Sequence, residues 1–381
     1  MSCLYSGTFL LLLVRLVMQV LLLDLGLELR GGQRQVYYLA QELLHSDVVP
    51  FIACPKASAL AVVCKKEQIP FIPLLGRSPA NPLILFQLEK ALRKLSINII
   101  HTNDAHSAAL GAFSKALHGN NILLMHSRRV SYPLHTGSRM KKYLLADSIV
   151  TVSEEIRKKV IQSGIEPNKV STIHSCIDPS LYYPKKDRKD GRFVFQSIGA
   201  LTSQKGYSNL LQAMHIIKKA KDLPPWEVRI AGSGELFQSL LNEAFELNVA
   251  SQLALLGQQD SRVILPLADA VVVPSVNGEG SNATIKEGWA TGIPVIASNL
   301  ESNAELIQDE VNGLLVPIND PVALAMAMIR CMQESQLCEK IVSEGTKSLQ
   351  NFTTTTMVKQ YLQIYRNLFP MSTIPQQQKA C

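Results

Sequence analysis

Two glutamates eight positions apart, Glu279 and Glu287, have the spacing and surroundings of a site for a nucleotide sugar. Residues 269–298 predict a buried strand, a glycine-containing loop, a short helix and a second buried strand. The N-terminus of that helix offers free N–H groups and a partial positive charge, which favour a phosphate. Glu287 lies roughly 6 Å along the helix axis from its start, and its carboxylate can accept hydrogen bonds from two ribose hydroxyls.

Glu279 precedes the helix, so we expect it on the other side of the phosphates, facing the sugar. Either Ser281 or Asn282 can cap the helix. The alternative interpretation is a surface loop and a solvated helix with two ordinary glutamates. The flanking buried strands and the close-set glycines favour a site. The further donor-binding candidates in this segment are Gly280, Ser281, Asn282 and Thr284.

The segment EGSNATIKEGWATGIPVIAS resembles the E-x7-E segment of GT-B glycosyltransferases, in particular family 4, the retaining enzymes that use nucleotide sugars. Other stretches match the family in the same order, from about residue 18 to residue 369. The resemblance implies an α/β fold of two doubly wound, Rossmann-like domains that face each other across a cleft. It also implies a retaining hexosyl- or related transferase of cell-envelope polysaccharide or lipopolysaccharide synthesis.

A second stretch, GALTSQKG at residues 199–206, resembles the G-R-L-x-x-x-K-G loop of the family. A lysine in a strand-to-helix loop, opposite glycine-rich backbone, is a suitable partner for a pyrophosphate. Lys205 and Glu279 are therefore candidate catalytic residues. The chain departs from the family at Ala200, where the family has arginine, so Lys205 neutralises the charge alone or another basic residue helps.

The first half of the chain contributes candidates at the ends of its strands. Gly31 and Gly32 lie in a strand-to-helix loop, where a ligand can approach the backbone. The resemblance places them near the donor phosphates, and the alternative is a plain turn. His126 follows a buried strand. The resemblance gives this histidine a catalytic role facing the transferred sugar, and the alternative is a polar residue at a strand end.

No metal or cofactor is expected. The sequence has no D-x-D motif, and residues 101–106 (HTNDAH) are better explained as cleft-lining or helix-capping groups than as metal ligands. Lys205 and the helix N-terminus would then stabilise the leaving group. Gly232 and Gly234 begin a dinucleotide fingerprint, but Phe237 replaces its third glycine, which disfavours an oxidoreductase. The remaining alternatives are a GT-B phosphorylase or epimerase and a non-catalytic nucleotide-sugar-binding or membrane scaffold protein.

Alternating strand and helix patterns predict two α/β domains. The charged stretch at residues 184–191 has the composition of a linker between them. The predicted units are an N-terminal extension at 1–17, an acceptor-side domain at 18–186, a nucleotide-sugar-binding domain at 187–352, a helix crossing back to the first domain at 353–369, and a disordered tail at 370–381.

The apolar N-terminal run and the spacing of the cysteines indicate where in the cell the protein is located. The apolar run at residues 9–23 is short for a membrane span and contains Arg15. No small-residue cleavage site follows it, so a secretory signal is not indicated. The seven cysteines lie far apart, without a C-x-x-C pair, which is typical of a reducing cytoplasm. We expect a cytoplasmic protein, free or peripheral on the inner face of the cell membrane.

The positive charge of the chain is concentrated in its first half. Residues 1–190 contain 24 Lys and Arg and 14 Asp and Glu, a net charge of +10, whereas residues 191–381 carry −3. This asymmetry indicates a negatively charged partner: a phosphorylated acceptor, an anionic membrane surface or a nucleic acid. The family resemblance implies that the acceptor meets the first half, so we expect an anionic glycolipid or saccharide acceptor at an anionic membrane surface and no nucleic acid. The alternative is that the charges only keep the domain soluble. The candidate membrane-binding cluster is Arg128, Arg129, Arg139, Lys141 and Lys142.

Overall fold

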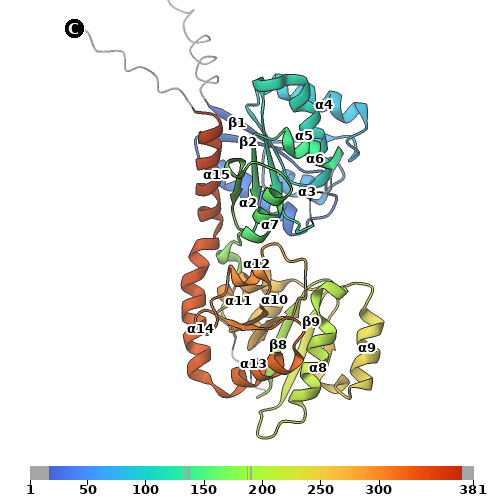
Figure 1. Cartoon of the computed structure of the whole chain (residues 1–381), viewed down its shortest axis with the longest axis vertical. Helices are drawn as coiled ribbons and strands as arrows, with labels where there is room; N and C mark the ends of the chain where they lie inside the picture. Colours follow the sequence, from blue (N-terminus) through green and yellow to red (C-terminus); the bar gives the residue numbers. More distant parts are fainter. Residues whose placement is uncertain (1–16, 133, 135–137, 187, 189–190, 371–381) are drawn as a thin grey trace, which may run out of the picture.

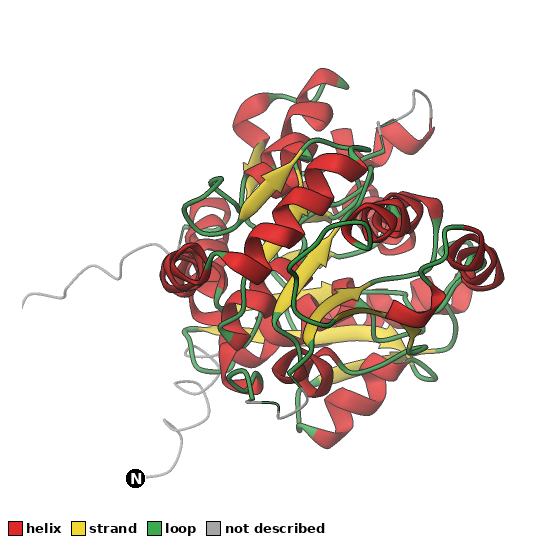
Figure 2. Ribbon diagram, turned by 90° about the horizontal axis from the view of Figure 1, so that it is seen from below, coloured by secondary structure: helices red, strands yellow, loops and turns green. Residues whose placement is uncertain are grey.

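The computed structural model describes residues 17–132, 134, 138–186, 188 and 191–370, and the predictions for residues 1–16 and 371–381 lie outside them. The chain forms two α/β domains stacked along its long axis (Figure 1). Each domain is a parallel sheet with helices packed around it. Figure 2, seen from below, shows strands in the interior with helices around them. The prediction of two doubly wound, Rossmann-like domains is confirmed.

The sheet of the first domain has seven strands in the order β3-β2-β1-β4-β5-β6-β7. Successive residues of β1 (Met18–Leu23) enter two different apolar clusters, with Val20 and Leu22 on one face and Leu21 on the other. A strand buried on both faces is continuously apolar, as the sequence MQVLLL nearly is. The other strands are β2 (Val48–Pro55), β3 (Phe71–Leu74), β4 (Ile99–Thr102), β5 (Leu123–Arg128), β6 (Ser148–Thr151) and β7 (Val170–Thr172).

The sheet of the second domain has six strands in the order β10-β9-β8-β11-β12-β13. The AVVV run is β11 (Ala270–Val273), and it also alternates between two clusters, with Val272 on one face and Val271 on the other. The other strands are β8 (Phe193–Ile198), β9 (Trp226–Ala231), β10 (Leu253–Leu255), β12 (Val295–Ser298) and β13 (Leu314–Val316).

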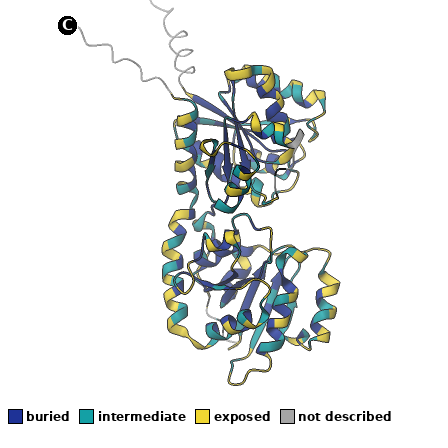
Figure 3. Ribbon diagram, viewed as in Figure 1, coloured by how far each residue is buried: buried dark blue, intermediate teal, exposed yellow. Residues whose placement is uncertain are grey.

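Helices connect successive strands and cover both faces of each sheet, where their apolar sides are buried (Figure 3). Within the described ranges, none of them is both long and apolar enough to cross a bilayer. The helices of the first domain are α2 (Gly31–Leu43), α3 (Ala59–Lys66), α4 (Pro82–Lys94), α5 (Ala105–His118), α6 (Ser138–Leu144) and α7 (Glu154–Gln162). Those that follow are α8 (Tyr207–Ile217), α9 (Phe237–Glu246), α10 (Ser261–Ile264), α11 (Ala283–Thr291), α12 (Glu301–Ala304), α13 (Pro321–Gln333), α14 (Ser335–Ser348) and α15 (Thr354–Leu368).

The last helix returns to the first domain. Figure 1 shows α14 beside the second domain and α15 continuing along the same side to the first. Thr353 caps α15 by accepting a hydrogen bond from the N–H of Thr356. Tyr361 and Tyr365 of α15 are buried in the same apolar cluster as β1 and α2. The core of the first domain therefore contains a helix from the far end of the chain.

Strand order reverses between β1 and β4 in the first sheet and between β8 and β11 in the second. At such a switch point the loops that leave neighbouring strands diverge, and a crevice opens at the carboxyl ends of the strands. The loop after β1 leads to Gly31 at the start of α2, the loop after β8 contains Lys205, and the loop after β11 contains Glu279. Topology thus brings these three candidates to the crevice edges of the two sheets.

The two domains also contact each other directly. Glu305, after α12, accepts hydrogen bonds from the N–H groups of Glu154 and Glu155 at the start of α7, with N–O distances of 2.7 and 2.9 Å. Ile177 and Tyr182, which follow the first sheet, are already buried in an apolar cluster of the second domain. These contacts define the relative position of the two crevice edges.

Candidate active site

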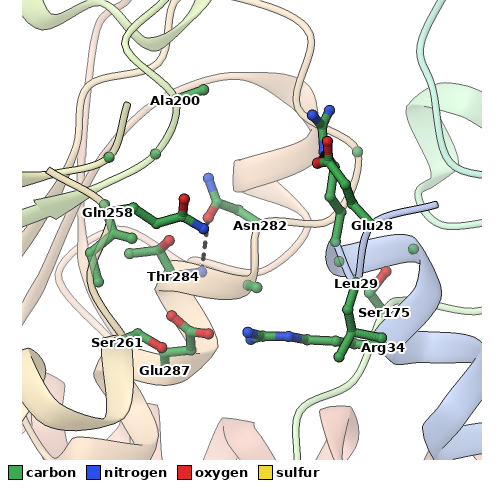
Figure 4. Close-up of a pocket in the computed structure, with 18 of the residues that line it drawn as sticks. Glu28, Leu29, Arg34, Ser175, Ala200, Gln258, Ser261, Asn282, Thr284 and Glu287 are labelled. Atoms are coloured by element: carbon green, nitrogen blue, oxygen red, sulfur yellow. Dashed lines mark hydrogen bonds and ion pairs between the residues drawn. The ribbon is translucent and has the colours of Figure 1, made fainter. Parts of the chain in front are cut away.

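A cavity of about 1200 Å³ lies between the two domains, at the crevice edges of both sheets. Its first-domain wall comes from the loop after β1, the start of α2, Arg129 and Ser175. Its second-domain wall comes from the loops after β8, β9, β10 and β11 and from the start of α11. Figure 4 shows side chains of both walls directed towards a common space. The predicted donor residues that line it are Gly31, Gly32, Lys205, Gly280, Ser281, Asn282, Thr284 and Glu287.

Glu287 lies on α11, one turn beyond the start of the helix, and its side chain faces the cavity (Figure 4). Asn282 caps the helix, because its Oδ1 accepts a hydrogen bond from the N–H of Thr284 at 3.0 Å. Glu287 is 6% exposed, and its Oε1 accepts a hydrogen bond from the hydroxyl of Tyr182 at 2.8 Å. Burial raises the pKa of Glu287, whereas the Tyr182 hydroxyl and the charge of Arg34 oppose that rise. The carboxylate is thus oriented and close to a cation of the opposite domain.

Glu279 and Lys205 form an ion pair at the cavity wall, with 2.6 Å between Nζ and Oε1. The loop of Lys205 ends at Gly206, whose φ of +65° is in the left-handed region. A Cβ on Gly206 would lie 2.1 Å from the carbonyl oxygen of Pro274, so only glycine lets the two loops pack this closely. This packing holds Lys205 against the loop that carries Glu279.

The glycines of the first domain leave open space beside the cavity. A Cβ on Gly31 would have no neighbour within 4 Å, and one on Gly32 would lie 3.6 Å from Cδ of Arg129. Helix α2 begins at Gly31 without a side-chain cap from Arg30. Across the cavity, a Cβ on Gly280 would lie 2.8 Å from the carbonyl oxygen of Arg129. The second domain therefore approaches the backbone of Arg129 closely at Gly280, whereas Gly31 and Gly32 leave room for a ligand.

His126 is not brought to the cavity. Its side chain is fully buried, with Nδ1 2.6 Å from Thr102 Oγ1 and Nε2 3.0 Å from the carbonyl oxygen of Lys142. Burial lowers the pKa of His126 to about 4. The alternation of β5 turns the ring towards the neighbouring strand β4 and helix α6 instead of the crevice. In this structure the residue is a packed strand-end histidine, which was the alternative interpretation.

Residues 101–106 serve packing and capping. His101 is fully buried between Tyr365 and Ser127, within hydrogen-bonding distance of both hydroxyls. Asp104 caps α5 by accepting hydrogen bonds from the N–H groups of His106 and Ser107. In the described part of the chain, no three His, Cys, Asp or Glu side chains are grouped as metal ligands would be.

The predicted cationic cluster is not a single exposed surface, so this part of the prediction is wrong. Arg128, the last residue of β5, is buried and donates a hydrogen bond to the hydroxyl of Tyr143. Arg129 lines the cavity, and Lys142 donates to the carbonyl oxygen of Ala105. Lys141 is exposed, and the side chain of Arg139 lies outside the described residues. Strand alternation at the end of β5 separates neighbours that the sequence places together.

Several lining residues are absent from the predicted site. They include Arg34 and Arg129 from the first domain and Gln258 and Ser261 from the second. Arg34 lies one turn into α2, beyond the glycine pair, and Figure 4 shows it pointing towards Glu287. In the sequence, only the preceding glycine pair indicates that Arg34 could line a site. A helix that begins beside a ligand places the side chains of its first turns near that ligand.

Two family models match adjacent parts of the chain, "Glycosyltransferase Family 4" at residues 29–181 and "Glycosyl transferases group 1" at residues 182–348. The chain is 27% identical over 292 residues to the UDP-Gal:alpha-D-GlcNAc-diphosphoundecaprenol alpha-1,3-galactosyltransferase of Escherichia coli, covering 70% of this chain and 75% of that protein. It is 28% identical over 173 residues to the lipopolysaccharide core biosynthesis glycosyltransferase LpsE of Rhizobium meliloti, covering 45% and 49% of the two chains.

Among solved structures, HepE of Anabaena in complex with UDP superimposes with a TM-score of 0.78 at 18% identity, over 92% of this chain and all of that one. At this identity the likeness shows the fold alone. The fold, the ordered motifs and the two adjacent family matches agree from residue 29 to residue 348. The chain belongs to the GT-B glycosyltransferases, with the two halves typical of family 4.

Proposed function

We propose that the chain transfers a hexose or related sugar from a nucleotide-sugar donor to an anionic acceptor, with retention of anomeric configuration. The observation that carries this proposal is the arrangement at α11. Glu287 is buried one turn inside a helix whose start lines the cavity, and the Lys205–Glu279 ion pair lies just before that start. Such a site offers acceptors to a ribose, N–H groups and a cation to a diphosphate, and a carboxylate to a sugar.

In the proposed reaction the acceptor hydroxyl attacks the anomeric carbon from the face that the nucleotide leaves. The bond from that carbon to the phosphate oxygen breaks as the new glycosidic bond forms, and the acceptor proton passes to the departing phosphate oxygen. Lys205 and the N-terminus of α11 stabilise the charge on the leaving group. Glu279 orients the sugar and Lys205. No covalent intermediate and no metal ion or cofactor take part in this scheme.

We further propose a phosphorylated, lipid-linked saccharide acceptor in cell-envelope polysaccharide or lipopolysaccharide synthesis, met at the cytoplasmic face of the membrane. The names of the E. coli and R. meliloti relatives support such an acceptor. The first domain also exposes Leu83, Phe86, Lys90 and Arg93 along one side of α4, a combination suited to an anionic bilayer. Recovery on anionic vesicles by flotation should exceed that on neutral ones and fall in L83Q/F86Q, and equal recovery on both would contradict this.

The test of the function uses the purified full chain with a panel of nucleotide sugars. Donors that raise the melting temperature are then incubated with synthetic polyprenyl-diphosphate saccharides. The anomeric configuration of the product is read from its proton coupling constants. We expect one or a few donors to be used and their configuration to be retained. Inversion would refute the retaining scheme, and failure of all donors to bind would refute the donor site.

A further inference from the structure

The charges that line the cavity are divided unequally between the two domains. The second-domain wall has Lys205 as its one cation among the described residues, against the carboxylates Asp260, Glu279 and Glu287. Lys205 is already paired with Glu279 at 2.6 Å. The usual arginine of the family loop is replaced by Ala200, which is exposed at the cavity. A diphosphate carries negative charge on each phosphate, so the second domain alone leaves it electrostatically under-compensated.

The first-domain wall supplies three arginines, and two of them have nearby carboxylates. Arg30 is ion-paired with Glu28, with 2.6 Å between Nε and Oε2. Arg34 points across the cavity at Glu287, at the end where we expect the ribose (Figure 4). The described residues place no carboxylate within 4.0 Å of Arg129. Arg34 likewise has no carboxylate within 4.0 Å among the described residues, but it lies at the ribose end. Burial raises the pKa of the Asp24 carboxyl, and the charge of Arg129 opposes that rise at longer range. Arg129 is therefore the arginine without an ion pair that lies nearer the loop of Glu279.

The surroundings of Arg129 hold its guanidinium in place without neutralising it. One amino group lies 3.4 Å from Oδ1 of Asn103, a weak contact, and Nε is buried with no hydrogen-bond partner. The charge lies close enough to the hydroxyl of Tyr361 to oppose the rise in its pKa that burial causes. Because Nε is buried, a ligand in the cavity would meet the terminal amino groups of Arg129, which carry the same delocalised charge.

Arg129 also lies where we expect the phosphates of the donor. Its backbone carbonyl packs against Gly280, the residue after Glu279, and its side chain passes Gly32 at the start of α2. It therefore lies between the bare backbone of the first domain and the loop that holds the Lys205–Glu279 pair. We propose that Arg129 binds the donor diphosphate from the first domain and supplies the cation that position 200 lacks. The proposal rests on the donor site proposed above.

The experiment measures nucleotide affinity by calorimetry in the full chain. Wild type is first screened with UDP, GDP and ADP. The affinity for the preferred nucleoside diphosphate is then compared with the affinity for the same nucleoside without phosphates. In Arg129→Gln we expect diphosphate affinity to fall by about 10- to 100-fold, the size of one or two charge-assisted hydrogen bonds. Nucleoside affinity should not change. Arg77→Gln, on an exposed loop outside the cavity, is the matched control and should bind as wild type does.

Rescue distinguishes a charge effect from a packing effect. Ala200→Arg, introduced into Arg129→Gln, should restore most of the lost diphosphate affinity, because it returns a cation to the opposite wall of the same cavity. Unchanged diphosphate affinity in Arg129→Gln, an equal loss for nucleoside and diphosphate, or no rescue by Ala200→Arg would each overturn the role of Arg129. If wild type binds none of the three diphosphates, the proposed function fails instead.

Discussion

Replacing Glu287 by glutamine tests the donor site most directly. The substitution removes one negative charge, and the neutral amide can retain one acceptor oxygen. A hydrogen bond to a charged group contributes about 1.5–3 kcal/mol and a neutral one about 0.5–1.5 kcal/mol. If both ribose hydroxyls donate to the carboxylate, we expect Glu287→Gln to lose about 2–3 kcal/mol of nucleotide affinity. That is roughly a 30- to 150-fold increase in Kd.

The stability of the empty protein should change in the opposite direction. Glu287 is 6% exposed, and burial raises its pKa above the unfolded value. The folded state therefore holds the proton more tightly, and ionisation of Glu287 costs stability once the pH exceeds the ordinary carboxylate range. Glu287→Gln removes that cost, so its melting temperature without ligand should equal or exceed that of wild type near neutral pH.

The assay is calorimetry with the preferred nucleoside diphosphate and with its 2′-deoxy analogue. Wild type should bind the deoxy analogue more weakly, whereas Glu287→Gln should distinguish the two ligands much less. Tyr182→Phe is the matched control, because it removes the hydrogen bond to Glu287 and leaves the carboxylate. A Glu287→Gln protein that folds normally and still discriminates between the two sugars as wild type does would refute the contact with ribose.

Metal independence, the buried His126 and the packing at Gly206 can each be tested separately. Sugar transfer should persist in excess EDTA, because Lys205 and the α11 N-terminus stabilise the leaving group in the proposed scheme. A loss of activity in EDTA that is reversed by magnesium or manganese would contradict the scheme. The free energy of unfolding should fall as the pH drops from 6.5 towards 4, because burial depresses the pKa of His126 to about 4 and the unfolded chain then binds a proton that the folded chain does not. The fall is up to about 1.4 kcal/mol for each pH unit crossed. Denaturant titrations of His126→Asn should show a shallower fall, and an unchanged slope would count against this role of His126. Gly206→Ala should destabilise the protein more than Gly292→Ala. Both positions have left-handed backbone, but a Cβ would clash with Pro274 at position 206 and would meet no atom at position 292. Equal melting temperatures of the two variants would argue against the close loop packing.

Local patterns were sufficient to predict the elements around α11. The signals for these elements lie within a few residues of one another: the AVVV run, the loop glycines, the capping Asn282 and the terminating Gly292. The local sequence therefore contains nearly all that is needed to predict the strand, the loop and the helix. The last helix is predicted at residues 353–369 and spans Thr354–Leu368, because its caps are equally local.

The errors arise where partners are distant in the sequence. The ring of His126 is turned by strand alternation towards Thr102 of the neighbouring strand, a contact that only the register of β4 and β5 determines. Arg128 and Arg129 are adjacent, but one is buried beside Tyr143 and the other lines the cavity. Arg34 becomes a site residue only because the second domain places Glu287 opposite it.

The return of α15 to the first domain affects how the chain can fold during synthesis. The strands of the first domain are complete once Thr172 has emerged, but its apolar cluster still lacks Tyr361 and Tyr365, and His101 lacks the hydroxyl of Tyr365. Roughly 190 more residues must be translated, which takes on the order of 10–40 s at about 5–20 residues per second. During that interval the nascent first domain exposes the apolar strip that α15 later covers. The second domain can complete its sheet before the first domain is closed.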